Sequence, residues 1–252
     1  MSDNALRGKT IIVTGAGGNI GRAYCDGLIA AGANLVMADL GDLSTQAQAY
    51  REQGGKAIAV VTDVSDNAQT QAMADAAQQA FGSIDGIINN AGFFKACTFG
   101  SLMDIPPDEW DKCFAINVRG LWQCCKAVIP AMKRQGGGKI INISSNTPYK
   151  GIPNFLHYVS SKAAIIGMSR SMSRELGEFN IQVNTLCPDL IPDDEITARQ
   201  GEQADQRTVA GRSLKRTQTP EDMVGAALFL LGPGSDFITG QSLLVNGGAH
   251  FL

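Results

Sequence analysis

The 252-residue sequence is poor in the residues that hold metals or bind nucleic acids. It contains only two histidines, His157 and His250, and its six cysteines form no CxxC pair, so the pattern predicts no metal site. Lys and Arg total 21 against 24 Asp and Glu, which leaves no basic excess for nucleic-acid phosphates. No apolar run reaches the roughly 20 residues that span a bilayer, and residues 1–8 lack a signal-peptide core. We therefore expect a cytoplasmic protein without a nucleic-acid or membrane partner.

Glycine, by contrast, is abundant, with 29 residues that fall between apolar runs. Short β-branched runs alternate with longer segments of helical periodicity, which is typical of a parallel sheet covered on both faces. We predict one α/β domain over residues 1–252, a Rossmann-type doubly wound parallel sheet, with a polar substrate lid at about 188–216. The expected strands are 10–13, 35–38, 57–62, 84–88, 139–143, 182–186 and 242–245, and the expected helices are 20–31, 44–53, 67–81, 108–134, 158–176 and 221–231.

A glycine-rich segment, Thr14–Gly21, lies between the first expected strand and the first expected helix. Glycines there let the backbone approach a pyrophosphate, whose charge is stabilised by free N–H groups and the helix dipole. A tight strand-helix turn also needs glycine for steric reasons, but the order strand, loop, helix favours a dinucleotide site. Asp39 ends the second strand, where a carboxylate accepts hydrogen bonds from ribose hydroxyls and repels a 2′-phosphate. No Lys or Arg lies within 15–21 or at Leu40, so NAD is favoured over NADP; the alternative for Asp39 is a capped strand-end turn.

Tyr158 and Lys162 are four residues apart and therefore share one face of a helix. An ammonium beside a phenol favours the phenolate, and it moves the tyrosine pKa from about 10 toward the operating pH of an acid/base catalyst. A lone pair of this kind is common on surface helices, so further residues must support the assignment. His157 adjoins Tyr158 but lies about 100° around the helix, which makes it a poor second base.

Several motifs together resemble those of the short-chain dehydrogenase/reductase family. They are Thr14–Gly21, Asp63-Val64, Asn89–Gly92, Asn117-Val118, Ile143–Ser145, Tyr158–Lys162, Thr239–Gln241 and Asn246–Gly248, and they cover nearly the whole chain. The resemblance implies an NAD(P)-dependent alcohol dehydrogenase or ketoreductase. It implies that Ser145 bonds the substrate oxygen, that Tyr158 exchanges the proton and that Lys162 binds the nicotinamide ribose. It also implies that Asn117 holds a water next to Lys162, and that helices 108–134 and 158–176 pair in a homotetramer.

The resemblance also gives the residues expected to contact the cofactor, and two places where this chain departs from the family pattern. Asn19 stands where glycine is usual, and we expect its tolerance of left-handed angles to preserve the loop. After the sixth strand, Asp189 and Asp193 replace a glycine and a threonine. Either the lid follows a different path, or Asp193, Asp194 and Glu195 face solvent, which we favour. These acids would then form an acidic mouth of the cavity that disfavours anionic substrates. The expected cofactor contacts are Gly15, Gly18, Asn19, Ile20, Gly21, Asp39, Leu40, Asp63, Val64, Asn90, Ala91, Gly92, Tyr158, Lys162, Pro188, Asp189 and Ile191.

The substrate walls are expected to be apolar and aromatic, which suits a small alcohol or ketone, aromatic and alicyclic ones included. Segment 145–158 is locally similar to family members that oxidise a hydroxyl next to an aromatic ring, those acting on pyridoxal and on 1-phenylethanol. One alternative is a 3-oxoacyl-(acyl-carrier-protein) reductase, and another is a catalytically silent NAD-binding regulatory protein. The expected pocket residues are Phe94, Asn146, Thr147, Tyr149, Phe155 and Leu190.

Overall fold

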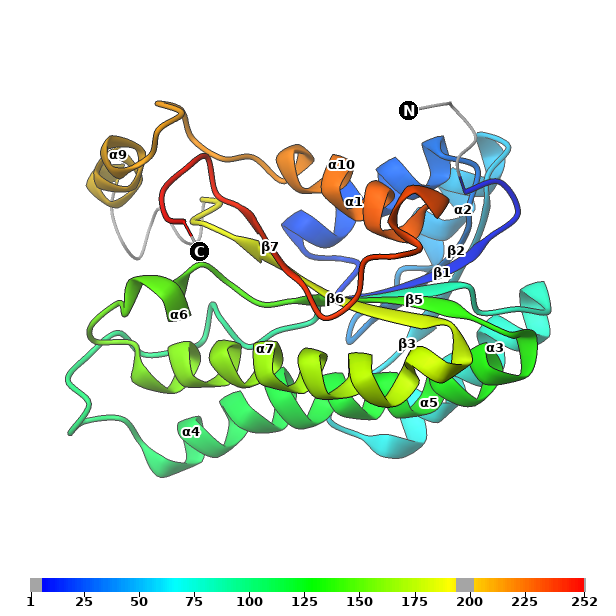
Figure 1. Cartoon of the computed structure of the whole chain (residues 1–252), viewed down its shortest axis with the longest axis horizontal. Helices are drawn as coiled ribbons and strands as arrows, with labels where there is room; N and C mark the ends of the chain where they lie inside the picture. Colours follow the sequence, from blue (N-terminus) through cyan, green and yellow to red (C-terminus); the bar gives the residue numbers. More distant parts are fainter. Residues whose placement is uncertain (1–5, 194–201, 252) are drawn as a thin grey trace.

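The computed structural model describes residues 6–193 and 202–251, with the backbone alone for 202–204 (Figure 1). Part of the expected lid, including Asp194 and Glu195, lies outside the described residues. Within the described ranges, none of the helices combines the length and the apolar character that crossing a lipid bilayer requires.

The described strands form one seven-stranded sheet in the order β3-β2-β1-β4-β5-β6-β7, and every neighbouring pair is parallel. A strand covered on both faces is buried along its whole length, as in β1, where Ile11, Ile12 and Val13 lie between two buried threonines. This sheet confirms the predicted doubly wound α/β class. The strands are β1 Thr10–Thr14, β2 Asn34–Asp39, β3 Lys56–Val61, β4 Gly86–Asn89, β5 Gly138–Ile143, β6 Ile181–Pro188 and β7 Ser242–Val245.

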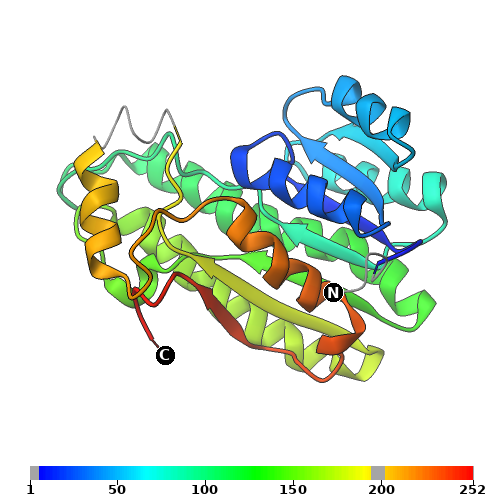
Figure 2. The same ribbon diagram turned by 90° about the horizontal axis from the view of Figure 1, so that it is seen from above.

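Helices cover both faces of the sheet. On one face, α1 and α10 lie next to each other together with α2, and on the other face lie α3, α5 and α7 (Figures 1 and 2). Each face packs its own cluster of buried apolar side chains between sheet and helices. The helices are α1 Asn19–Ala30, α2 Ser44–Glu52, α3 Asn67–Phe81, α4 Pro107–Phe114, α5 Leu121–Gln135, α6 Thr147–Lys150, α7 Leu156–Leu176, α9 Glu202–Gly211 and α10 Glu221–Leu231.

Local sequence signals explain where α3 and α5 begin and end. The Asp66 side chain accepts hydrogen bonds from the backbone N–H groups of Ala68 and Gln69, which caps the start of α3. Gly82 ends α3 and Gly136 ends α5, each in the left-handed conformation that glycine adopts without steric cost.

The single helix expected over residues 108–134 is interrupted. A π-helical segment, Ala115–Gly120, joins α4 to α5, so the prediction of one uninterrupted α-helix was wrong. Short π-helical segments are frequent at functional sites. They change the backbone hydrogen bonding without requiring particular residue types, so the hydrophobic periodicity of the sequence does not reveal them. The segment carries Asn117, which is buried.

The strand order reverses between β1 and β4, and the loops that follow these two strands meet there. Gly15, with φ +65, packs so closely on Ala91 that an added Cβ would lie 2.9 Å from the Ala91 Cα. The carboxyl ends of β5 and β6 reach the same edge, and α6 and α9 lie at that end of the molecule (Figure 1). In open α/β sheets this reversal is where ligands bind.

Candidate active site

A cavity of about 880 Å³ opens at the carboxyl edge of the sheet. One end is formed by the glycine loop after β1 together with Asp39, and the other carries Ser145, Tyr158 and Lys162. All of the residues expected to contact the cofactor line this cavity, as do Phe94, Thr147, Phe155 and Leu190 of the expected substrate pocket.

The glycine loop is shaped to leave room for a bound group. A Cβ on Gly21 would lie 2.1 Å from the Gly15 carbonyl oxygen, so only glycine lets α1 start this close to the loop. Gly18 precedes α1 with an extended backbone. Asn19 is the first residue of α1 and has no left-handed backbone, so the conformational tolerance that we invoked for it is not needed. The loop fits the pyrophosphate of a dinucleotide, because the unpaired N–H groups of a helix start face the cavity.

The Asp39 carboxylate lies against this loop. Its Oδ2 accepts a hydrogen bond from the Gly17 N–H (2.8 Å), and its Oδ1 accepts one from the Gly41 N–H (3.2 Å). Asp39 therefore caps the strand-end turn and also lines the cavity, and its contact with a ribose stays a prediction. Arg22, just beyond the loop, donates from Nε to the Gly17 carbonyl (2.9 Å) and does not line the cavity.

Asn90 ties the loop after β4 to the loop after β1. Its Nδ2 donates to the carbonyls of Thr14 and Gly15, both at 3.1 Å, and its N–H donates to the Thr14 hydroxyl (3.1 Å). These bonds hold the two loops at the fixed separation that the cavity requires.

Ser145, Tyr158 and Lys162 converge from the end of β5 and from the first half of α7. The Lys162 ammonium donates to the Ile143 carbonyl (2.9 Å) and lies 5.6 Å from the centre of the Tyr158 ring. The Ser145 hydroxyl hydrogen-bonds Tyr158, and its Oγ accepts from the Thr147 N–H (3.1 Å). All three catalytic candidates are buried, and they share one wall of the cavity.

The ionisation of Tyr158 differs from the prediction. Burial raises the pKa of the phenol above its usual value, and the hydrogen bond from Ser145 only partly offsets this shift. Burial also lowers the pKa of Lys162 to about 8, because a buried ammonium loses its hydration. In the protein without a bound cofactor, the pKa of Tyr158 therefore does not move downward as predicted, because desolvation of the phenol is the largest effect.

Asn117 contacts the loop after β4 and the helix α7. Its Oδ1 accepts from the Phe93 N–H (2.6 Å), while its Nδ2 donates to the Phe93 carbonyl (3.2 Å) and to the Ser161 hydroxyl (2.9 Å). A Cβ on Gly92 would lie 3.4 Å from Asn117 Oδ1 and 3.6 Å from Lys162 Nζ, so the two side chains flank Gly92. Asn117 thus fastens the loop beside Lys162, and its expected role in holding a water stays a prediction.

An aromatic cluster surrounds Tyr158. Phe155 stacks on the Tyr158 ring with the ring centres 4.6 Å apart, and Phe94 lies 5.1 Å from the same ring. Phe99, which the sequence analysis did not select, stacks on Phe155 at 4.1 Å and is 46% exposed at the cavity. The catalytic end of the cavity is therefore walled by aromatic rings, as predicted.

Two expected pocket residues, Asn146 and Tyr149, do not line the cavity. The buried Asn146 amide bonds Asp189 (3.5 Å) and Asn246 (3.3 Å), so it faces the protein interior. Tyr149 stacks on His250 instead, with the ring centres 5.8 Å apart. The segment after Ser145 forms the short helix α6, in which Thr147 and Lys150 line the cavity and Tyr149 does not. The sequence did not predict this helix.

Of the acids expected at the mouth, the two that the structure describes, Asp189 and Asp193, are paired with cations. Asp193 is only 18% exposed and pairs with Lys95 across the cavity (2.8 Å), so it does not face solvent freely. Asp189 is 6% exposed and pairs with Lys150 (2.6 Å) and Arg212 (3.0 Å). Burial acts to raise the pKa of Asp189, but the two cations outweigh it and hold that pKa below its usual range. The expectation that Asp193 faces solvent was wrong, because its partner Lys95 comes from a segment distant in sequence; Asp194 and Glu195 lie outside the described residues.

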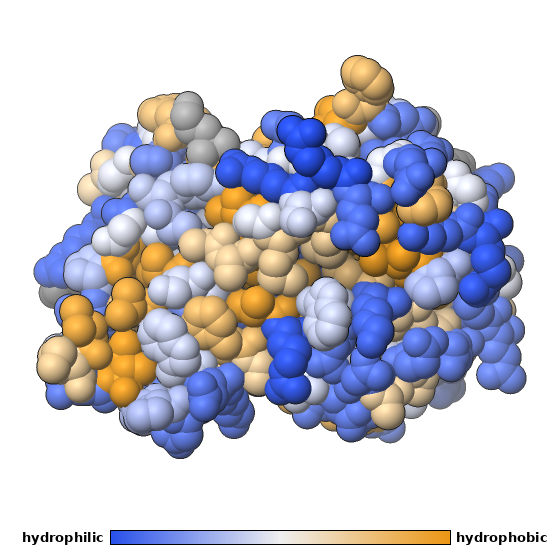
Figure 3. All heavy atoms as spheres, turned by 60° about the horizontal axis from the view of Figure 1, so that its bottom comes forward, coloured by the Kyte–Doolittle hydropathy of each residue, from blue (hydrophilic) through white to orange (hydrophobic). Residues whose placement is uncertain are grey.

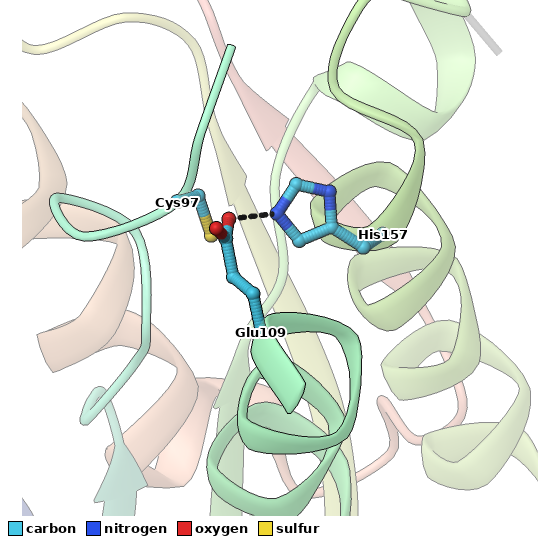
Figure 4. Close-up of side chains that lie close together, drawn as sticks. All are labelled: Cys97, Glu109 and His157. Carbon is cyan, nitrogen blue, oxygen red and sulfur yellow. Dashed lines mark hydrogen bonds and ion pairs between the residues drawn. The ribbon is translucent and has the colours of Figure 1, made fainter. Parts of the chain in front are cut away.

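His157 lies outside the cavity, next to Glu109 of α4 (Figure 4). Its Nε2 is 2.8 Å from Glu109 Oε1, and the hydroxyl and N–H of Thr98 donate to the same carboxylate. Cys97, Glu109 and His157 offer donor atoms within 4.8 Å of one another. The Glu109 oxygens already accept these hydrogen bonds, so we interpret Cys97, Glu109 and His157 as a structural group. It connects the loop after β4 to α4 and α7.

The sequence analysis missed several residues of the cavity wall. Gly17 lies in the glycine-rich segment Thr14–Gly21 that the sequence analysis had identified. Its position two residues after Gly15 was a sufficient signal that it belongs to the cofactor loop. Lys112 and several apolar residues had no signal of this kind, since their positions depend on loop conformations. The wall residues that the sequence analysis did not select are Gly17, Thr62, Phe99, Lys112, Ile116, Ile143, Ser144 and Thr208.

Comparison with known proteins supports this description. A family model described as enoyl-(acyl carrier protein) reductase matches residues 15–250. The chain is 33% identical to 7alpha-hydroxysteroid dehydrogenase of Escherichia coli K12 over 250 residues, which are 98% of this chain and 96% of that protein. A gluconate 5-dehydrogenase from Burkholderia cenocepacia, solved with NADP and tartrate, superposes with a TM-score of 0.92 at 31% identity, covering 98% of this chain and 97% of that one. An NAD+-bound xylitol dehydrogenase gives a TM-score of 0.89 at 32% identity, covering 98% and 100%.

Proposed function

We propose that this chain, an oxidoreductase that belongs to the short-chain dehydrogenase/reductase family, transfers a hydride between NAD and a small, mostly apolar alcohol or ketone. The observation that carries the proposal is that Ser145, Tyr158 and Lys162 share a cavity with the glycine loop and Asp39. When bound, the nicotinamide supplies or accepts the hydride. In this proposal Ser145 bonds the substrate oxygen, Tyr158 exchanges a proton with it, and Lys162 binds the nicotinamide ribose.

NAD, rather than NADP, is proposed because the Asp39 carboxylate lies at the ribose end of the cavity. A 2′-phosphate there would approach a like charge, and the cost of that repulsion is large in a partly buried site. The related structures named above contain NADP in one case and NAD+ in the other. The choice therefore depends on Asp39 of this chain and not on its relatives.

The substrate is proposed to carry an aromatic or alicyclic ring next to the reacting carbon. Phe94, Phe99 and Phe155 form a continuous aromatic wall beside the Tyr158 hydroxyl, and rings pack well against such a wall. The related dehydrogenase of E. coli is named for a hydroxysteroid, which is an alicyclic alcohol. A 3-oxoacyl-(acyl-carrier-protein) reductase is the alternative, and a relative of that name from Chlamydia trachomatis, 35% identical over 246 residues, supports it.

Absorbance at 340 nm, which follows the reduced cofactor, tests the proposal. The purified protein is mixed with NAD or NADP and a panel of neutral aromatic and alicyclic alcohols, and the reverse reaction is run with the matching ketones and acetoacetyl-carrier protein. We expect turnover of ring alcohols with NAD. Turnover confined to the acyl-carrier substrate with NADPH would favour the alternative. Cofactor binding without any turnover would indicate a silent regulatory protein.

We also propose that four copies assemble through α4, α5 and α7. Figure 3 views this face, on which apolar side chains form a central band between hydrophilic ones. Trp122 of α5 is exposed, and Met168 and Met172 of α7 are partly exposed there. Light scattering should give the mass of a tetramer, and a mass of 26.6 kDa for the free chain would contradict this.

A cytoplasmic location belongs to the same proposal, because all six cysteines are buried free thiols.

A further inference from the structure

Positive charge gathers at the catalytic end of the cavity. Among the described wall residues, the side chains of Lys95, Lys112, Lys150 and Lys162 lie at this end, against the carboxylates of Asp189 and Asp193. The acids at the opposite end, Asp39 and Asp63, belong to the wall expected to hold adenosine. A cavity with this distribution favours a substrate that brings a negative group to its catalytic end.

The positive charge of Lys150 belongs to a group of three charges, in which the side chains of Asp189 and Arg212 are buried and residue Lys150 is exposed. Asp189 has two oxygens, and each faces a different cation: Oδ1 is 2.6 Å from Lys150 Nζ, and Oδ2 is 3.0 Å from Arg212 Nε. Arg212 is almost wholly buried and also donates to the carbonyls of Leu190 (2.7 Å) and Arg216 (3.0 Å). One carboxylate thus balances one of two cations, which leaves a net charge of one positive unit in this group.

Lys150 is the member of the group that a ligand can reach. Its side chain is 25% exposed and lines the cavity, whereas the Arg212 side chain is 1% exposed and lies behind the wall. An ammonium carries three hydrogens, and Asp189 accepts one of them. Lys150 is the last residue of α6, the short helix that begins two residues after Ser145, and both Lys150 and Ser145 line the cavity.

We propose that Lys150 is an anion-binding subsite for the substrate. The preferred substrate is then a ring alcohol or ketone with a carboxylate, phenolate or similar anionic group beyond the reacting carbon. Asp189 and Arg212 hold the Lys150 ammonium in place, and the aromatic wall takes the ring. This inference rests on the proposed function, and it reverses the selectivity that an acidic mouth would give.

Matched pairs of ligands test the subsite. 1-Phenylethanol and 4-(1-hydroxyethyl)benzoate differ by one carboxylate, and so do their ketones acetophenone and 4-acetylbenzoate. We expect the carboxylate to raise kcat/KM at least tenfold, mainly through KM, since a charge-assisted hydrogen bond forms in the bound state. Calorimetric titration should give a similar ratio between the dissociation constants of the two ketones, measured with NAD present.

Three variants separate a subsite from a general effect of charge. Lys150→Met removes the ammonium but leaves the Asp189–Arg212 pair, so we expect an unchanged melting temperature, normal turnover of 1-phenylethanol and loss of the preference for the carboxylate. Lys150→Arg should keep most of the preference. Lys112→Met removes another cation of the same cavity and should keep the preference in full.

Two results would overturn the proposal: a wild-type preference for the neutral ligands, or an equal preference in the wild-type protein and Lys150→Met. If neither alcohol is turned over, the proposed function fails, and the ketone titrations still decide whether Lys150 binds the carboxylate.

Discussion

The Lys162 ammonium lies 5.6 Å from the centre of the Tyr158 ring and is held there by the Ile143 carbonyl. This geometry lets the lysine act on the tyrosine without a direct bond between them. Burial raises the pKa of Tyr158, so the phenol needs nearby positive charge to release its proton near neutral pH. Lys162, whose own pKa burial lowers to about 8, stays mostly charged at pH 7 and provides it.

Replacing Lys162 with Met should therefore reduce kcat by about 10²- to 10⁴-fold, the usual contribution of general acid/base catalysis. Methionine fills a similar volume and removes the desolvation cost of the ammonium, so we expect no loss of melting temperature. We expect wild-type activity to decline as the pH rises well above 8, where Lys162 loses its charge, and we expect the variant to lack this decline. A kcat close to that of the wild type would show that the lysine does not act on Tyr158.

Replacing Asp39 with Ala should change the choice of cofactor. Loss of the carboxylate removes acceptors for the ribose hydroxyls and the repulsion of a 2′-phosphate, and it also frees the Gly17 N–H. We expect NAD to bind about tenfold more weakly and NADP to bind more tightly than before, as measured by calorimetric titration of each. An unchanged ratio of the two dissociation constants would indicate that Asp39 serves the strand-end turn alone.

Replacing Gly21 with Ala should disrupt cofactor binding through the backbone alone. The new Cβ would lie 2.1 Å from the Gly15 carbonyl oxygen, so the loop or the start of α1 must move. The matched control is Gly225→Ala in α10, where nothing lies within 4 Å of the added Cβ. The control should bind NAD normally and gain up to about 1 kcal/mol of stability from lower chain entropy. Equal NAD affinity in both variants would contradict the close packing of this loop.

Replacing Asp189 with Asn should destabilise the protein, because Lys150 and Arg212 would face each other without a counterion. Breaking a buried pair in this way costs about 3–5 kcal/mol at pH 7. The pKa of Asp189 is lower in the folded protein than its unfolded value, so its contribution is complete above about pH 4 and falls as the pH drops further. Denaturant unfolding from pH 7 to pH 3 should show the two proteins converging in stability on the acid side. A constant difference would contradict the ion-pair account.

The sequence predicted the elements whose signals are local. The helices Asn67–Phe81 and Glu221–Leu231 have the predicted bounds, because an N-cap or an early proline starts each and glycine follows each. The residues expected around the dinucleotide all line one cavity, since their motifs follow consecutive strand ends. The π-segment at Asn117 could not be predicted, because it changes hydrogen bonding without changing residue type.

The charges at the catalytic end show the limit of sequence reasoning. Lys95 and Asp193 follow different strands, and so do Lys150 and Asp189; only the folded sheet brings each pair together. The sign of the electrostatic potential at the catalytic end of the cavity depends on these ion pairs and not on the acids alone. We therefore propose the opposite of the selectivity that the acids alone predict, because Lys150 and Arg212 lie beside Asp189.

The central claim is that the Tyr158 hydroxyl exchanges the proton of the reaction. Tyr158→Phe keeps the ring stacked on Phe155 and removes only the hydroxyl. The account predicts that this variant binds NAD with wild-type affinity in a calorimetric titration and loses turnover of ring alcohols at 340 nm by at least a thousandfold. Turnover within a few-fold of the wild-type rate, in a variant with normal NAD affinity, would contradict it.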